Sequence, residues 1–128
     1  MDHRPVPYAI SMEAKPGYLH VRVSGENTPE TVGRYMRETF ETLEAHGLHR
    51  VLIEENLAGP SLSQMQMFDL IATRAESRPP AVTIAYVDAN PDHDSDRLRF
   101  AETAARNRGF LLHLFPTVRE AEAWLAAG

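Results

Sequence analysis

The sequence predicts an α/β domain with the element order ββαβαβαβα, in which a mostly parallel five-stranded sheet is flanked by four helices. Short β-rich runs alternate with stretches whose apolar residues recur at helical spacing, and this alternation is typical of parallel strands joined by right-handed crossovers. The first two β-rich runs are separated only by the turn Lys15-Pro16-Gly17. The first strand is therefore expected to lie antiparallel to the second, at or near one edge of the sheet.

The first half of the chain carries clear start and stop signals. Strands are expected at Tyr8–Met12 and Tyr18–Val23, where β-rich residues dominate. Thr28 is a suitable N-cap for a helix that begins at Pro29, and Gly47 is a suitable end. The apolar stripe of this helix, which we expect to face the core, consists of Val32, Tyr35, Met36, Phe40 and Leu43.

The second half repeats the strand–helix alternation. The remaining strands are expected at Arg50–Glu54, Ala81–Val87 and Phe110–Phe115. The remaining helices are expected to start near Gln64, Arg97 and Val118, the last of them at a capping box formed by Thr117 and Glu120. Pro79-Pro80 ends the second helix and Gly109 the third.

Composition indicates one globular domain, residues 1–128, with residues 1–7 as a loose N-terminal arm. The net charge of −5, with scattered basic residues, argues against a nucleic-acid partner. The absence of cysteine excludes disulfides, thiolate zinc sites and a cysteine nucleophile. No run approaches the ~20 apolar residues of a membrane span, and the N-terminus does not read as a signal peptide. We therefore expect no membrane span and a cytoplasmic location.

The stretch LIEENLAGPSLSQMQMFDL, residues 52–70, holds two serines at the start of the second helix. Ser63 and Gln66 have the spacing of a capping box, with Ser61 in the entry turn and Leu62 able to pack against Met67. We interpret Ser63 as a structural cap. Phosphorylation stays open, because a phosphate at a helix N-terminus meets a favourable dipole. A catalytic serine is not indicated, since the G-x-S-x-G elbow is absent.

Glu54 and Glu55 are expected at the carboxyl end of their strand, where α/β proteins tend to bind ligands. Adjacent strand residues point to opposite faces, so the two form a poor acid–base pair. We expect one to face solvent and the other to pair with an arginine. In the following helix, Met65, Met67 and Phe68 have the spacing of core residues, and Met65 could instead face a pocket.

The loop from Asp88 to Asp96 holds the densest group of carboxylates. Its D-x-N-x-D spacing is that of the first ligands of a calcium loop, but His93 stands where the turn glycine is needed and Arg99 where the bidentate glutamate is needed. We therefore expect a solvated loop whose last acids cap the third helix, and no tight binding of a divalent metal. His113, between two leucines, is expected to be a strand residue and not a ligand.

The hairpin start, the serine that opens the helix after the third strand, and the ending FPTVREAEAWL together resemble the SpoIIAA-like (STAS) fold. The resemblance runs from Tyr8 to Leu125 and is greatest to the bacterial branch labelled STAS/CRAL-TRIO-like. It implies that the four parallel strands lie in chain order. In the anti-sigma-antagonist branch a partner kinase phosphorylates the serine of an Asp-Ser-x-Gly pattern. The corresponding residues here are Leu62-Ser63-Gln64-Met65, so only the serine matches.

This resemblance implies a non-enzymatic STAS-like regulatory or protein-interaction module without catalytic residues, metal or cofactor. Its partner would be another protein or a second copy in a homodimer. An alternative is a small carrier domain that binds an apolar or lipid-like ligand, and a third is an enzyme that uses the loop from Asp88 to Asp96. The candidate ligand or partner surface consists of Glu54, Ser61, Ser63, Met65 and Asp88.

Overall fold

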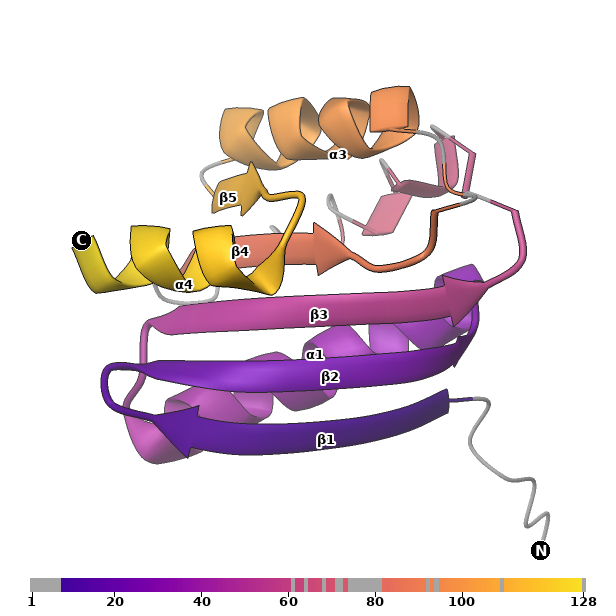
Figure 1. Ribbon diagram of the computed structural model, residues 1–128. Helices are drawn as coiled ribbons and strands as arrows, with labels where there is room; N and C mark the ends of the chain where they lie inside the picture. Colours follow the sequence, from indigo (N-terminus) through magenta and orange to yellow (C-terminus); the bar gives the residue numbers. More distant parts are fainter. Residues whose placement is uncertain are drawn as a thin grey trace, which may run out of the picture.

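A computed structural model confirms the predicted α/β architecture (Figure 1). It describes residues 8–60, 62, 63, 65–67, 69, 70, 73, 82–91, 93, 95–108 and 110–127. The five strands are β1 (Tyr8–Lys15), β2 (Tyr18–Glu26), β3 (Arg50–Ala58), β4 (Thr83–Asp88) and β5 (Leu111–Leu114). They lie side by side in chain order, with β1 antiparallel to β2 at one edge and all other pairs parallel.

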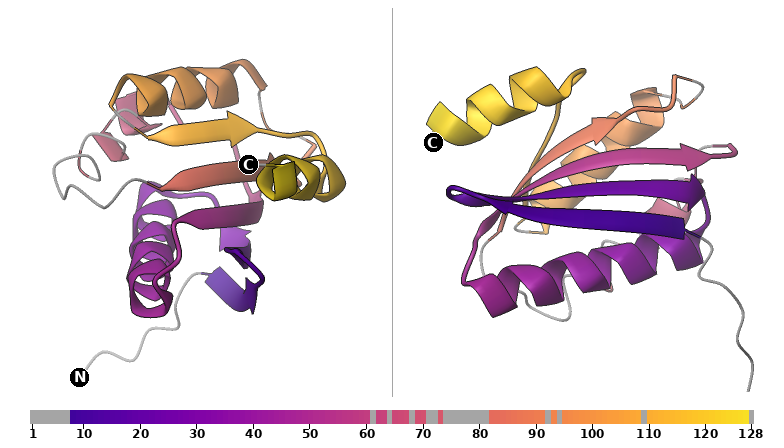
Figure 2. Two further views of the ribbon diagram at one scale, coloured as in Figure 1. Left: turned by 90° about the vertical axis from the view of Figure 1, so that its left-hand side faces the viewer. Right: turned by 60° about the horizontal axis from the view of Figure 1, so that its bottom comes forward.

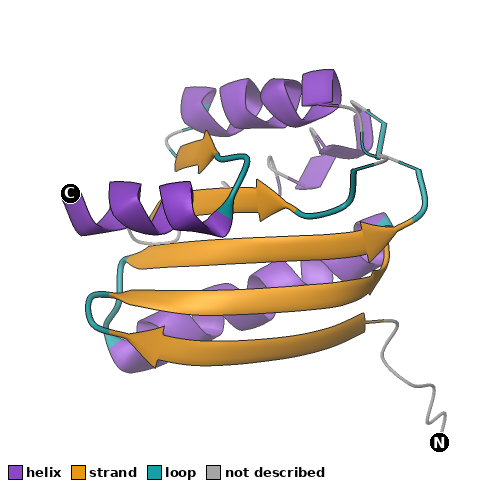
Figure 3. Cartoon of the chain, viewed as in Figure 1, coloured by secondary structure: helices purple, strands orange, loops and turns teal. Residues whose placement is uncertain are grey.

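The helices begin close to their predicted starts. They are α1 (Pro29–His46), α3 (Ser95–Asn107) and α4 (Val118–Ala127). Figure 3 shows the helices and strands along the chain. Between β3 and β4, residues 65–67, 69, 70 and 73 are helical, and we call them the second helical segment. The predicted start of that helix at Gln64, and its predicted end at Pro79-Pro80, lie outside the described residues, as does Gly109. None of the described helices is long and apolar enough to cross a membrane.

Helices cover the two faces of the sheet unequally. Edge-on views place α1 and α3 on one face and α4 on the other (Figure 2). The alternation of β3 matches this arrangement, because Val51 and Ile53 belong to the core under α1, whereas Leu52 belongs to a second core with Ala121 and Leu125 of α4. The sheet is thus buried on both faces at β3, as its apolar run predicts.

Local signals account for α1. The Thr28 side chain accepts a hydrogen bond from the backbone N–H of Thr31 at 3.1 Å, Pro29 follows in the first turn, and Gly47 ends the helix with φ of 63°. The predicted stripe is only partly buried, however. Tyr35 and Leu43 are fully enclosed, whereas Val32, Met36 and Phe40 are half-buried, because they line a cavity.

β3 is longer than expected. It continues beyond Glu54 to Ala58, since Asn56, Leu57 and Ala58 pair with Ser24, Gly25 and Glu26 of β2. The expectation that Glu54 and Glu55 end the strand is therefore wrong: both lie inside it. Pairing with a neighbouring strand decided the boundary, and local sequence did not show it.

The α4 core generates a stability prediction. Leu125 is 2% exposed and packs in the core with Leu52, so we expect Leu125→Ala to cost about 2–5 kcal/mol of unfolding free energy. Leu111→Ala is the matched control, because Leu111 is 45% exposed, and its cost should stay below about 1 kcal/mol. Urea denaturation measures both. Equal losses would mean that α4 does not form the second core.

Candidate functional site

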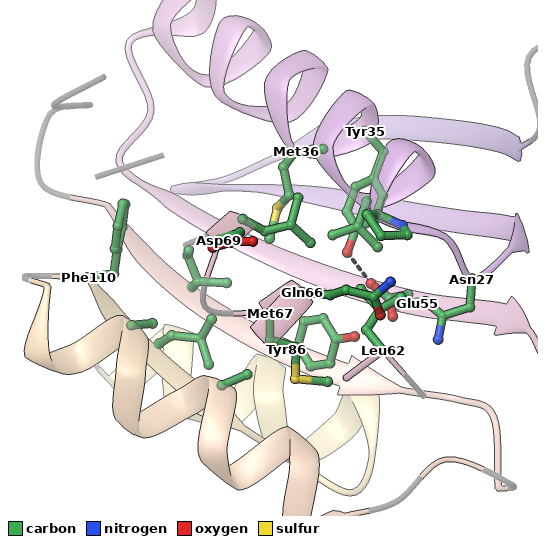
Figure 4. Close-up of a pocket in the computed structure, with 18 of the residues that line it drawn as sticks. Asn27, Tyr35, Met36, Glu55, Leu62, Gln66, Met67, Asp69, Tyr86 and Phe110 are labelled. Carbon is green, nitrogen blue, oxygen red and sulfur yellow. Dashed lines mark hydrogen bonds between the residues drawn. The ribbon is translucent and has the colours of Figure 1, made fainter. Parts of the chain in front are cut away.

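A cavity of about 470 Å³ lies on the α1 side of the sheet. This volume is within the range of roughly 300–1,000 Å³ that is usual for small-molecule sites. Residues of α1, the second helical segment, α3, β4 and β5 line it (Figure 4). The lining side chains Pro29, Arg37, Gln66, Asp69 and Thr73 are exposed, so the cavity opens to solvent between α1 and the second helical segment.

The two ends of the cavity differ in polarity. Asn27 and Glu55 lie at one end and Phe110 at the other (Figure 4). The polar end is at the carboxyl-terminal half of the parallel strands, where ligands of open α/β sheets tend to bind. The remaining wall is mainly apolar, with Val32, Met36, Phe40, Leu62, Met67, Leu70, Ile84, Ala101, Ala105, Leu112 and Leu114. The cavity therefore suits a ligand with an apolar body and one polar group.

Glu55 is the central polar group of this site. It is 4% exposed, and its carboxyl group accepts a hydrogen bond from the hydroxyl of Tyr35, which α1 contributes. The hydroxyl of Tyr86, from β4, also hydrogen-bonds this carboxyl. Three elements thus meet at one buried acid, and both tyrosines are themselves at most 9% exposed.

Burial raises the pKa of Glu55 to about 7, even though the hydrogen bonds from Tyr35 and Tyr86 favour the charged form. The charge of the nearby Asp88 adds to the rise, and His93 opposes it. Burial likewise raises the pKa of both tyrosines well above its usual value, so they remain hydroxyl donors. Glu55 can consequently take up or release a proton near neutral pH.

Asp88 is the register partner of Glu55 on β4, and both side chains line the cavity. Oδ2 of Asp88 lies 2.5 Å from Nδ1 of His93, and both side chains are almost fully buried. Nε2 of His93 lies 3.1 Å from the carbonyl oxygen of Gly59. Burial alone would lower the pKa of His93, but the hydrogen bond and charge of Asp88, with the Gly59 carbonyl, raise it overall. Asp88 thus favours the imidazolium form of His93, and the contacts of this side chain tie the loop after β4 to the loop after β3.

The expectation of a solvated loop from Asp88 to Asp96 is wrong at its start, because the side chain of Asp88 is buried. The second oxygen of Asp88 accepts from the backbone N–H of Asn90 at 2.9 Å, and the Asn90 amide donates to the carbonyl of Leu57 at 2.7 Å. Asp92 and Asp94 lie outside the described residues. Within the described part of the chain, no three acidic or histidine side chains are grouped so that they could hold a metal ion.

Glu54 lies on the opposite face of the sheet. Its Oε1 is 3.2 Å from Nε2 of His20 and 3.3 Å from Nε of Arg22, so the expected arginine partner is found. The expectation that the other glutamate faces solvent is wrong, because Glu55 is buried. His113 is on β5, as expected, with its ring centroid 4.8 Å from that of Trp124.

Ser63 and Gln66 form the predicted capping box. The backbone N–H of Gln66 donates to Oγ of Ser63 at 3.1 Å, and the N–H of Ser63 donates to the side-chain oxygen of Gln66 at 2.9 Å. Met67 is buried, as expected, whereas Met65 is 68% exposed, so its placement in the core is wrong. Ser61 and Phe68 lie outside the described residues. The structure therefore brings together Ser63 and Met65 at one helix start, with Asp88 in the cavity and Glu54 on the other side of the sheet.

The sequence pattern does not reveal the group formed by Tyr35, Tyr86, Glu55 and His93. The spacing of Tyr35 indicates only an apolar stripe, and the position of Glu55 indicates only a strand end. One signal was present: an acid inside the run VLIEENL, at the same alternation as Val51, Ile53 and Leu57, is expected to point into the core. A buried acid needs donors, and tyrosines at facing positions supply them.

Replacement of Ser63 tests the cap. We expect Ser63→Ala to lower the unfolding free energy by about 1 kcal/mol, because it leaves the N–H of Gln66 without its acceptor. Ser63→Asp retains an acceptor and places a negative charge at the helix N-terminus, so it should be nearly neutral for folding. Chemical denaturation of both variants gives the comparison. Equal destabilisation by both would contradict the cap.

The raised pKa of Glu55 predicts a pH-dependent stability. Between pH 4.5 and about 7 the unfolded chain releases this proton while the native protein keeps it, so stability falls as pH rises through this window. Relative to Glu55→Gln, which cannot titrate at this position, the unfolding free energy of the wild-type protein should fall by on the order of 3 kcal/mol across the window. Unfolding measurements at several pH values provide the test. Glu54→Gln is the control and should follow the wild-type profile; a constant difference between the wild type and Glu55→Gln would refute the prediction.

No protein-family model matches the chain, and no curated protein matches it. Four chains of solved structures match. One of them is described as an anti-sigma factor antagonist from Mycobacterium paratuberculosis; it superposes with a TM-score of 0.60 and 17% sequence identity, over 96% of this chain and 97% of that one. Together with the strand order and the antiparallel edge strand, this likeness establishes that the chain has the SpoIIAA-like (STAS) fold.

Proposed function

We propose that this chain is a non-enzymatic regulatory module that acts by binding another protein. The observation that carries the proposal is the fold likeness over nearly the full length of both chains to a protein described as an anti-sigma factor antagonist. A protein so described acts against another protein and not on a small substrate. Fold alone does not determine function, so the contact surface has to be identified in this chain.

The proposed contact surface is the start of the second helical segment, around Ser63 and Met65. Met65 is the most exposed of the large apolar side chains that the structure describes, at 68%. Methionine is enriched in protein interfaces, where its flexible side chain adapts to a partner. The hydroxyl oxygen of Ser63, next to Met65, accepts the capping hydrogen bond from the backbone N–H of Gln66. In this proposal Ser63 holds the helix start in place, and partner binding does not require its phosphorylation.

Substitutions on this surface test the proposal. The tagged protein, cross-linked in extract of its own cells, should capture a partner protein, and Met65→Lys should lower the captured amount at least tenfold. Leu111→Lys is the control and should capture the normal amount, because Leu111 is exposed on β5, away from the helix start. Ser63→Ala should also bind normally. If Ser63→Asp abolished capture while Ser63→Ala retained it, the serine would be a switch and the cap would not explain its role. Equal capture by Met65→Lys would remove Met65 from the surface.

A second candidate function is the binding of an apolar or lipid-like ligand. The cavity of about 470 Å³, lined mainly by apolar side chains, specifically favours it. Native mass spectrometry of freshly purified protein is the direct test: a retained small molecule would support this function, and a doubled mass would identify a second copy of the chain as the partner.

A further inference from the structure

We propose that the cavity binds an amphiphile with a protonated amine head, whose ammonium group lies against Glu55 and whose hydrocarbon chain extends towards Phe110. This inference rests on the second candidate function above, since it names the ligand class that the same cavity would take. Three features of the cavity carry it: its two-ended polarity, the use of its donors within the protein, and the excess of acid at its polar end.

The polarity of the cavity sets the orientation of the ligand. Asn27 and Glu55 lie at one end of the cavity and Phe110 at the other (Figure 4). Asp88 is the register partner of Glu55, and Ala105, which accepts a backbone hydrogen bond from Phe110, also lines the cavity. Apolar surface removed from water at the Phe110 end contributes about 25 cal/mol per Å². A hydrocarbon chain therefore belongs at the Phe110 end, and a polar head belongs at Glu55.

Most hydrogen-bond donors at the polar end are already engaged within the protein. Tyr35 and Tyr86 both donate to Glu55. The amide nitrogen of Asn27 donates to the carbonyl of Pro60 at 2.9 Å. The ring nitrogens of His93 lie within hydrogen-bond distance of the Asp88 carboxylate and the Gly59 carbonyl. A head group that needs donors, such as a carboxylate or phosphate, would meet few that are free. A head group that brings its own donors meets the carboxyl oxygens of Glu55.

The charges around Glu55 also favour a cation. The groups that face it are Tyr35 from α1, Tyr86 and Asp88 from β4, and His93 from the following loop. His93 balances Asp88, which leaves Glu55 without a cation of its own among these groups. Arg37 and Asp69 also line the cavity, but both are exposed and belong to its rim. An ammonium group would supply that cation, whereas a carboxylate head would repel the charged form of Glu55.

Binding of an amine is linked to the protonation of Glu55. Near pH 7 the buried carboxyl is partly protonated, and an ammonium ion favours its charged form, so binding displaces the proton. An aliphatic amine stays charged throughout, with a pKa of about 10. Affinity should consequently rise as the pH increases through 7 and level off above it.

The experiment compares three probes of equal chain length below their micelle concentrations: dodecylamine, dodecanol and dodecanoate. Isothermal titration with the full chain should give dodecylamine at least a tenfold advantage over dodecanol at about pH 8, and this advantage should fall towards about pH 5.5. Dodecanoate should bind most weakly. Glu55→Gln should remove both the advantage of the amine and its pH dependence, and retain the binding of dodecanol.

Glu54→Gln is the matched control. It makes the same change one residue away, on the opposite face of the sheet, and should leave all three affinities as in the wild type. Thermal unfolding of each variant confirms that it is folded before titration. Equal binding of dodecylamine and dodecanol, an amine advantage that survives in Glu55→Gln, or tightest binding of dodecanoate would overturn the amine head while keeping the cavity as a ligand site. Failure of all three probes to bind would reject the ligand-binding function itself.

Discussion

The buried carboxyl group of Glu55 is the interaction on which the α1 side of this protein depends. A carboxyl group removed from water is costly unless it is hydrogen-bonded, and Tyr35 and Tyr86 supply those bonds from two further elements. The position of α1 over the sheet is therefore determined by more than apolar contact, because Tyr35 must reach β3. The same requirement brings a polar group to the floor of an otherwise apolar cavity.

The two consecutive glutamates of β3 lie on opposite faces of the sheet, in very different environments. Glu54 lies on the α4 side, half-exposed, beside His20 and Arg22, where water screens the interactions and their net contribution is small. Glu55 lies on the α1 side, where burial shifts its proton equilibrium towards neutral pH. Strand alternation alone separates these roles. Comparison of these two adjacent glutamates therefore shows the effect of burial on the same side chain.

The parts of the fold that depend on local signals could be predicted from the sequence. The capping residues Thr28 and Ser63 are found in the expected bonds, and the turn at Gly17 pairs β1 with β2. The end of β3 could not be predicted in this way, because Asn56 to Ala58 are held in the strand by pairing with β2. The STAS-like strand order came from resemblance, and the structure confirms it.

The candidate site was harder to predict, because a cavity forms where side chains from different elements leave space between them. Val32, Met36 and Phe40 have the spacing of core residues, and the same spacing serves a cavity wall equally well. Met65 and Met67 are two residues apart, about 200° around a helix, so they point to opposite faces and only Met67 is buried. Which of the two faces the sheet is a tertiary property that periodicity does not give.

The second helical segment joins the two proposed activities in one piece of structure. Its inner side, with Met67, forms part of the cavity wall together with Leu62, which precedes the segment. Its outer side carries Met65 next to the cap at Ser63. Gln66 belongs to both, since it completes the capping box and lines the cavity. A ligand that contacts this wall and a protein that contacts Met65 therefore act on the same few residues. If a ligand in the cavity changes the affinity of the outer surface for its protein partner, reciprocity requires that the partner change the affinity for the ligand by the same factor. Where the segment is held rigidly by its cap and by the packing of Met67, the two binding events are independent. The capping box and the packing of Met67 thus determine together how strongly the cavity and the outer surface are coupled.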